Sequence, residues 1–300
     1  MSPSVELRDL RKSYGKFTAV DGISLEIPNG SIFGLLGPNG AGKTTTIRML
    51  MDIIAPDSGA IHFFGRERRP QDLRRVGYLP EERGLYPKMT VIDQLVFLGR
   101  LRGLTKREAV PAIEHWLERI ELAEWGRKKV EELSKGMQQK IQLVGTVLHD
   151  PDIVILDEPF SGLDPINQGL FKDLLAEYKA NGKTVLFSTH IMEQAEKLCD
   201  RICLISRGNA VLSGELDQIK GDFGGHSFQL IADGDLAKVQ EVPGVEQALL
   251  DNGGARLVLS NETDGASVLR ELVSFLTVHE FRSEAPGLEE IFIKAVKGSG

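Results

Sequence analysis

The 300-residue sequence contains little cysteine and no long apolar run. Its two cysteines, Cys199 and Cys203, are too few and too close together for a disulfide framework, which favours a reducing compartment. No stretch of 18 apolar residues occurs, so we expect no membrane-spanning helix. The first ten residues lack the basic segment and apolar run of a secretory signal, so none is expected. Any role at a membrane would therefore be peripheral.

The sequence also lacks an excess of positive charge. Its formal net charge is −7 and its pI is about 5.5, so the basic footprint of nucleic-acid-binding proteins is absent and no nucleic-acid partner is expected. Short basic runs at 66–69 and 127–129 adjoin acidic residues, and we interpret them as solvated surface. With 41% apolar and 26% charged residues, the chain has the composition of a globular protein of one or two domains.

The first half of the chain passes from strand patterns to helix patterns. Alternating apolar residues over 5–10 and 19–27 predict antiparallel strands. A continuous apolar run at 32–36 predicts a buried strand that leads into a helix over 44–51. Residues 90–148 then follow a helical period, with capping boxes at their helix starts, and predict a helical subdomain. Pro111 lies inside the second helix of this part, where we expect it to remove a hydrogen bond or introduce a kink.

The second half returns to an α/β pattern and ends in a smaller domain. Strands are predicted at 153–156 and 184–188, with a helix over 165–180 between them and a hairpin over 202–212. The predicted boundary follows, so that residues 1–220 form an α/β domain and residues 221–300 an accessory domain. The accessory domain is predicted to be a small α+β sandwich, of which the ferredoxin-like fold is one form, from strand and helix patterns at 228–231, 236–242, 247–250, 256–259, 267–276 and 278–281.

A phosphate-binding loop is predicted between the strand at 32–36 and the helix that follows it. The segment GPNGAGKT matches G-x-x-x-x-G-K-[ST] and has the strand and helix context that this motif requires. The backbone N–H groups of such a loop surround phosphate oxygens, Lys43 reaches the β- and γ-phosphates, and the Thr44 hydroxyl is available to Mg²⁺. The candidate nucleotide-binding residues here are Gly37, Pro38, Asn39, Gly40, Ala41, Gly42, Lys43, Thr44 and Thr45.

Two consecutive carboxylates end the predicted strand at 153–156. Asp157 is positioned to hold Mg²⁺, and Glu158 to orient and polarise the water that attacks a γ-phosphate. A strand that ends in Asp-Glu is a weak signal alone. It becomes strong about 115 residues after a phosphate loop in a matching α/β frame, so we take Lys43 and Glu158 as candidate catalytic residues.

Further segments, in the right order, resemble ATP-binding-cassette (ABC) ATPases. Leu133-Ser134-Lys135-Gly136-Met137 opens a helix with Ser134 as a natural N-cap, and is similar to the signature motif of this family. Ser161-Gly162-Leu163-Asp164 resembles its D-loop, and His190 after Phe187-Ser188-Thr189 resembles its switch histidine. Tyr14 is similar to the aromatic residue that stacks on adenine. The resemblance covers residues 4–220.

The resemblance implies an α/β phosphate-loop NTPase of the ABC cassette type, with a RecA-like core, an antiparallel β subdomain and a helical subdomain. It implies binding of ATP with Mg²⁺, and a third catalytic residue, His190, beside Glu158. It also implies a homodimer in which each signature segment covers the ATP of the other chain, and a separate integral membrane permease contacted through residues 81–90. The chain would then lie in the cytoplasm at the inner face of the cell membrane. The nucleotide contacts carried over from the family are Tyr14, Ser134, Lys135, Gly136, Met137 and Asp164.

One position departs from the family pattern. The family usually has glutamine after the strand at 76–79, whereas this sequence has Glu81 followed by Glu82. Glu81 can offer an oxygen to Mg²⁺, but it cannot donate the hydrogen bond of an amide. These glutamates, the Leu-Ser-Lys-Gly-Met variant and the segment at 286–292 resemble sodium-export and drug-resistance ATPases, which favours export. The accessory domain could regulate, dimerise, contact the permease or stabilise the fold.

Three other functions compete with transport. The first is a soluble ABC ATPase of translation or DNA maintenance, but the sequence has neither a second cassette with a basic linker nor a long coiled-coil insertion. The second is another phosphate-loop enzyme, a kinase or a GTPase, which the signature segment and His190 disfavour. The third is an ATP-binding regulator without transport. No motif in this chain indicates the transported substrate.

Overall fold

The computed structural model describes residues 2–82, 84–223, 227–251, 253–260, 263–283 and 286–298. These residues form two compact units, and the boundary between the units lies between Gly214 and Glu215.

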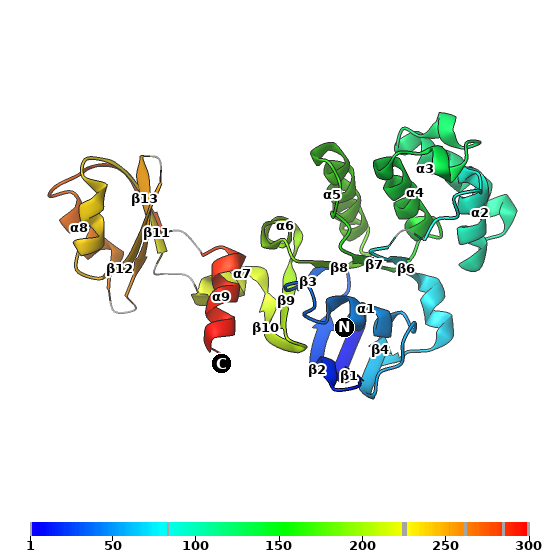
Figure 1. The fold of residues 1–300 in the computed structure, drawn as a ribbon, viewed down its shortest axis with the longest axis horizontal. Coiled ribbons are helices and arrows are strands. Elements are labelled where there is room, and N and C mark those ends of the chain that lie inside the picture. Colours follow the sequence, from blue (N-terminus) through cyan, green and yellow to red (C-terminus); the bar gives the residue numbers. More distant parts are fainter. Residues whose placement is uncertain are drawn as a thin grey trace. The chain divides into compact units, whose positions relative to one another are not determined.

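A six-stranded sheet forms the centre of the first unit, with strand order β10-β9-β3-β8-β7-β6 (Figure 1). The neighbouring pairs β9-β3, β3-β8, β8-β7 and β7-β6 are parallel, so these strands end at one edge of the sheet. β3, β7 and β8 are buried along their whole length, as their continuous apolar sequences require. The strand bounds are β3 Ile32–Leu36, β6 Val76–Leu79, β7 Ile153–Asp157, β8 Thr184–Thr189, β9 Arg201–Ser206 and β10 Asn209–Glu215.

A second, antiparallel sheet of the first unit has the order β2-β1-β4-β5. Its strands are β1 Val5–Tyr14, β2 Phe17–Ile27, β4 Ser58–Phe63 and β5 Arg66–Glu67. The helix α1, Lys43–Leu50, contributes Ile47, Met49 and Leu50 to a core that also contains apolar residues of both sheets. This packing fixes the helix that follows the predicted phosphate loop.

The basic run at 66–69 is not simply solvated, and that interpretation is wrong for Arg68. Its side chain is 15% exposed, and its guanidinium donates to the carbonyls of Met49 and Leu50 at the end of α1. Cations stabilise the carbonyl end of a helix. Arg68 therefore supports the C-terminal end of the helix that follows the phosphate loop.

A helical part follows in the chain, made of α2 Val91–Leu101, α3 Lys106–Arg119 and α4 Lys135–Val147, with the short helices η1 Pro70–Arg75, η2 Ala123–Trp125 and η3 Val130–Glu132. Thr90 and Thr105 cap α2 and α3 as the sequence predicts. Residues of all three long helices share one apolar core. Pro111 does not end α3, which continues through it because Ala109, Ile113 and Leu117 bury one face of the helix.

Two further helices of the first unit alternate with the strands of the central sheet. α5, Pro165–Ala180, lies between β7 and β8 in the chain, and α6, Met192–Leu198, lies between β8 and β9. α5 buries Phe171, Leu174 and Leu175. The sequence predicts α5 but does not identify α6, whose seven residues are too few to show a clear helical period.

The second unit contains a four-stranded antiparallel sheet of order β12-β13-β11-β14. From β11 to β14 the elements follow the order strand, 3-10 helix, strand, strand, helix, strand, which is the βαββαβ pattern expected for a ferredoxin-like unit. Buried residues of the sheet, η4 and α8 form a separate apolar core. The element bounds are α7 Leu216–Phe223, β11 Ser227–Asp233, η4 Leu236–Glu241, β12 Val245–Asp251, β13 Gly254–Leu259, α8 Gly265–Leu272, β14 Thr277–Ser283 and α9 Leu288–Gly298.

Candidate functional site

The loop between β3 and α1 depends on glycine at two positions. Gly37 has φ +151°, and a Cβ placed there would lie 2.2 Å from the carbonyl oxygen of Ile205. Gly42, the N-cap of α1, has φ +111°, and its Cβ would lie 2.4 Å from the carbonyl oxygen of Ala19. Larger residues would therefore push the loop away from β9 and β2. The loop takes the tight path that a phosphate cradle needs.

Lys43 lies at the start of α1 with its side chain only 5% exposed. Its ammonium donates to the carbonyl of Gly37 at 2.7 Å and lies 3.2 Å from Oε1 of Glu158. A buried cation needs such partners, because burial without them is costly. The loop and the carboxylate that the sequence separates by 115 residues thus converge on one ammonium group.

Asp157 ends β7 and is almost completely buried, at 1% exposure. Its Oδ1 accepts hydrogen bonds from Ser188 Oγ at 2.6 Å and from Thr44 Oγ1 at 3.3 Å. Burial raises the pKa of this carboxyl above its ordinary value, although both hydrogen bonds oppose the shift. Its Oδ2 is buried and has no hydrogen-bond partner among the described residues. This free oxygen is the kind of ligand that a divalent cation requires.

Glu158 is held in an unusual backbone conformation beside Asp157. Its φ is +49°, and its backbone N–H donates to Ser188 Oγ at 2.9 Å. The carboxylate bridges two partners, since Oε1 faces Lys43 and Oε2 lies 3.0 Å from Nδ1 of His190. His190 follows β8 directly and is exposed, with 42% of its side-chain surface accessible. Ser188 was not predicted from the sequence, where its position two residues before His190 on a core strand is the available signal.

A cavity of about 290 Å³ opens over the loop. It brings together most of the predicted phosphate contacts with Glu158 and Glu81. Its aromatic wall is Phe17, which pairs with Tyr14 across the β1–β2 turn. Tyr14 itself does not line the cavity. The lining residues are Phe17, Ala19, Asn39, Gly40, Ala41, Gly42, Lys43, Thr44, Thr45, Glu81 and Glu158.

A second cavity, of about 430 Å³, shares Glu81 and Glu158 with the first. Asp157 and Glu158 line it together with Glu81 and Glu82 from the segment after β6. Two glutamines of α4, Gln139 and Gln142, complete its wall. These buried amides were not predicted from the sequence, because the apolar residues beside them dominate the pattern of the helix.

The signature segment lies at the start of α4. Ser134 caps this helix by accepting the N–H of Met137 at 3.3 Å, as the sequence predicts. Lys135 and Gly136 form the first turn, so unpaired N–H groups and the positive end of the helix dipole gather here. None of the residues 134–137 is among the described residues that line the phosphate cavity of the same chain.

Asp164 serves as the N-cap of α5. Its Oδ1 accepts the N–H of Asn167 at 2.9 Å, and this bond lowers the pKa of the exposed carboxyl. The geometry therefore gives Asp164 a structural role, and nucleotide contact by this residue stays a prediction.

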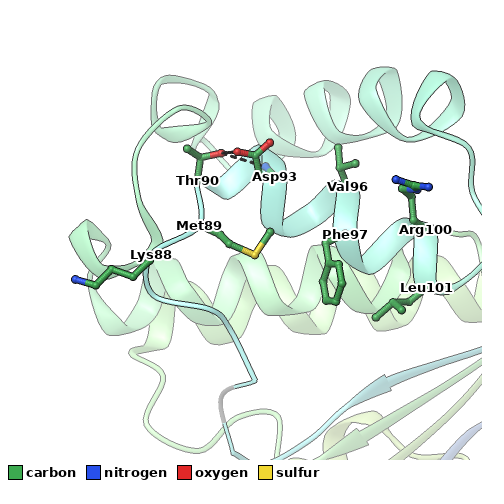
Figure 2. Close-up of a pocket in the computed structure, with 8 residues that line it drawn as sticks. All are labelled: Lys88, Met89, Thr90, Asp93, Val96, Phe97, Arg100 and Leu101. Carbon is green, nitrogen blue, oxygen red and sulfur yellow. Dashed lines mark hydrogen bonds between the residues drawn. The ribbon is translucent and has the colours of Figure 1, made fainter.

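A third cavity, of about 820 Å³, lies along α2 and the segment before it (Figure 2). Phe97 and Leu101 point from one side of α2 in Figure 2. Tyr86 makes an edge contact with Phe97, with 5.6 Å between the ring centroids. Tyr86 and Leu101 are 53% and 63% exposed. Large apolar side chains exposed together mark a surface for a partner. Its lining residues are Lys88, Met89, Thr90, Asp93, Val96, Phe97, Arg100 and Leu101.

Comparison with known proteins identifies the family. The chain is 46% identical over 285 residues to the uncharacterized ABC transporter ATP-binding protein YhaQ of Bacillus subtilis, and the alignment covers 95% of this chain and 96% of YhaQ. The chain belongs to the ATP-binding proteins of ABC transporters. It is also 36% identical over 303 residues to the Nod factor export ATP-binding protein I of Paraburkholderia xenovorans, covering 97% of this chain and 96% of that protein.

Family models and solved structures agree with this assignment. A model described as "ABC transporter" matches residues 20–161, and one described as "ATP-binding protein DrrA1-3-like, C-terminal domain" matches residues 214–296. The solved structure of an ATP-binding subunit of an ABC transporter matches this fold with a TM-score of 0.68 and 32% identity. The match covers 73% of this chain and 92% of that chain. The solved structure of cbiO1 of Clostridium perfringens, part of the complex cbiONQ, matches with a TM-score of 0.64 and 25% identity. This match covers 74% of this chain and 92% of cbiO1.

The family assignment confirms several predictions made from the sequence. The ABC cassette fold is confirmed, and the chain is an ATPase of a family that binds ATP and couples its hydrolysis to transport. Members of this family work with membrane permeases. Among the described helices, none is long and apolar enough to cross a membrane. The roles of individual site residues and the position of the domain boundary stay predictions.

Proposed function

We propose that this chain is the motor subunit of an ABC exporter, which binds ATP between two copies and hydrolyses it to drive a separate permease. One observation carries the proposal: Lys43, Glu158 and His190 form a chain of contacts of 3.2 Å and 3.0 Å at the edge of the phosphate cavity. This arrangement joins a phosphate ligand, a water-activating carboxylate and a histidine at one place.

Each of these residues then has a distinct role. Lys43 exchanges its contact with Glu158 for the β- and γ-phosphates when ATP binds. Glu158 accepts a hydrogen bond from the attacking water and polarises it, while His190 orients Glu158 and contacts the γ-phosphate. Adenine stacks on an aromatic residue at the β1–β2 turn, where the cavity favours Phe17 and the family resemblance favours Tyr14.

The residues of the site fit a magnesium ion that arrives with the nucleotide. Asp157 offers its unpartnered Oδ2, Thr44 its hydroxyl and Glu81 a carboxylate oxygen. Bound Mg²⁺ would neutralise charge that develops on the phosphates during transfer. Among the described residues, no three His, Cys, Asp or Glu side chains gather into a metal site of their own. The remaining ligands would therefore come from ATP and water.

Two copies of the chain complete each site. The N-terminus of α4, with Ser134 as its cap, is suited to a γ-phosphate but does not line the phosphate cavity of its own chain. A head-to-tail homodimer would bring it to the nucleotide of the partner, as the family resemblance implies. Ser134, Lys135, Gly136, Met137 and Asp164 are the proposed contacts across this interface.

The permease is proposed to contact the exposed surface around Tyr86, Phe97 and Leu101. This surface adjoins residues 81–90, which connect Glu81 of the nucleotide site to α2. Binding there would keep the chain peripheral, at the cytoplasmic face of the cell membrane. Export is the proposed direction, supported by the names of relatives such as the Nod factor export proteins.

The Glu158→Gln variant tests the proposed chemistry. Gln keeps the size of the side chain but removes the charge that polarises water, so ATP binding should persist while turnover falls by a factor of about 10² or more. The ATP-loaded variant should also accumulate as a dimer. Steady-state phosphate release, nucleotide binding and size-exclusion chromatography with light scattering measure these three results.

Glu177→Gln is a matched control, because Glu177 pairs with Arg119 on a partly exposed surface outside the site. It should leave turnover and oligomeric state unchanged. Retained turnover in Glu158→Gln would contradict the role assigned to this carboxylate. The absence of any integral membrane protein after co-purification from detergent extract would contradict the transport role.

A further inference from the structure

Gln139 joins the signature helix to the backbone that carries Glu158. It lies on the second turn of α4, five residues after Ser134, and is only 9% exposed. Its Nε2 donates to the carbonyl of Pro159 at 3.0 Å and approaches the carbonyl of Ser161 at 3.4 Å. Pro159 directly follows Glu158, so this bond lies one residue from the carboxylate proposed to act on water.

The backbone at Glu158 needs such support. A φ of +49° is costly for a residue with a long side chain, and it persists only where neighbouring contacts impose it. Ser188 holds the N–H of Glu158 on one side, and Gln139 holds the carbonyl of Pro159 on the other. The direction of the Glu158 carboxylate therefore depends on contacts from β8 and from α4.

The chemistry of the contact requires an amide. Both neighbours of Nε2 are carbonyl oxygens, so a donor is needed and the opposite orientation of the amide would place two acceptors against each other. Oε1 of Gln139 is buried and has no partner among the described residues. An unpaired buried oxygen is unfavourable, so the contacts of Nε2 with the two carbonyls must offset this cost.

A second amide of α4 holds the other loop of the site. Gln142 Nε2 approaches the carbonyls of Pro80 and Glu82 at 3.4 Å and 3.3 Å, next to Glu81. Gln139 and Gln142 are three residues apart and thus lie on the same face of the helix. One rigid helix contacts both segments that line the cavity beside Glu158.

We propose that Gln139 is a positioning residue: it holds the turn that carries Glu158, and so links the signature helix of a chain to the water-activating carboxylate of the same chain. Displacement of α4, when Ser134 engages or leaves the nucleotide of the partner, would move the Pro159 carbonyl and with it Glu158. Hydrolysis at one site thereby depends on engagement at the other. This inference rests on the proposed function.

Two substitutions test the role of the amide. Gln139→Ala removes the contact, and Gln139→Glu keeps its size but replaces the donor with an acceptor. In both, we expect the kcat for ATP to fall about tenfold, because small misplacements of a catalytic group are costly, while KM changes less than about twofold. The measurement is steady-state phosphate release by the full-length chain, with thermal unfolding recorded in parallel.

Thr146→Val is the matched control. Thr146 is also buried on α4, seven residues after Gln139, and its hydroxyl donates to the carbonyl of Gln142 at 2.9 Å and lies 3.3 Å from the carbonyl of Tyr78. Val keeps the shape and removes this bond, so the variant should lose thermal stability yet keep the wild-type kcat. If the Gln139 variants turn over ATP as fast as Thr146→Val, or lose only affinity, the proposal is wrong.

A double-mutant cycle separates positioning from general damage. If Gln139 acts through Glu158, adding Gln139→Ala to Glu158→Gln should change the residual turnover by less than about twofold. A full tenfold further loss would overturn the proposal. If Glu158→Gln turned over ATP as fast as the wild type, the proposed function itself would be contradicted. The two failures are therefore distinguishable.

Discussion

At the scale of single residues, the site combines groups that the sequence identifies with groups that only packing reveals. Lys43, Asp157 and Glu158 follow from their motifs, because the chemistry of phosphate transfer requires these residue types in this context. Ser188 and Gln139 do not, since serine and glutamine occur in many environments. Their importance comes from the hydrogen bonds that they make to the Asp-Glu pair and to the turn after it.

Burial of the Asp157 carboxylate leads to a prediction about stability and pH. Burial raises its pKa in the folded protein, so the charged form destabilises the fold at neutral pH. In the absence of nucleotide and Mg²⁺, Asp157→Asn should raise the thermal midpoint at pH 7 by a few degrees. In their presence, the same variant should have no Mg²⁺-dependent turnover. The gain should be complete above the raised pKa and disappear as the pH falls toward the ordinary value of about 3.9. Thermal unfolding at several pH values measures this, and equal stability at all pH values would contradict it.

The two aromatic residues of the β1–β2 turn lead to a second prediction. Phe17 lines the phosphate cavity, whereas Tyr14 does not. Phe17→Ala should therefore weaken ATP binding more than Tyr14→Ala, by roughly 1–2 kcal/mol, or about tenfold in Kd, if the ring stacks on adenine. Fluorescent-nucleotide titrations measure both variants. A larger loss with Tyr14→Ala would assign the stacking role to the residue that the family resemblance indicates.

At the scale of elements, strands and helices with a strong apolar pattern were predictable, and elements with a weak local pattern were not. β3, β7 and β8 have continuous apolar sequences, and their ends carry the phosphate loop, the Asp-Glu pair and the histidine. By contrast, β4, β5 and α6 give weak local signals, because their pairing and burial depend on residues far away in the chain. Pro111 is a similar case, since packing of α3 outweighs the local cost of proline.

The loop between β3 and α1 leads to a prediction at this scale. In Gly37→Ala, the added Cβ would meet the Ile205 carbonyl at 2.2 Å, so the loop must move away from β9. We expect loss of nucleotide binding and a lower thermal midpoint. Gly182→Ala is the control, because Gly182 also has a positive φ, of +72°, but has open space around it, and should cost only roughly 1 kcal/mol of stability. Calorimetry and nucleotide titration measure both, and equal effects would contradict the steric argument.

At the scale of the whole molecule, the proposed homodimer makes each site a composite of two chains. Lys43→Ala should inactivate the phosphate-loop half of each site. Ser134→Asp should inactivate the signature half, because Asp still caps α4 but repels phosphate. Mixing the two inactive variants should restore turnover to at most roughly a quarter of the wild-type value, since half of the dimers are then mixed and each has one intact site, whose rate also depends on engagement at the other site. ATPase assays on co-refolded or co-expressed chains measure this. A mixture that stays as inactive as its components would contradict the head-to-tail dimer.

The amino-acid sequence alone was sufficient for the family and the cassette fold, and it predicted Lys43, Asp157, Glu158 and His190 as residues of the site. Phosphate loops, signature segments and strand-terminal carboxylates are local patterns, and each depends on backbone chemistry within a few residues. The convergence of Lys43, Glu158 and His190, the choice of Phe17 over Tyr14 as cavity wall, and the contact of Gln139 with Pro159 required three-dimensional packing. These features join segments that are distant in the chain, and their geometry follows from how the sheets and α4 bury their apolar faces together.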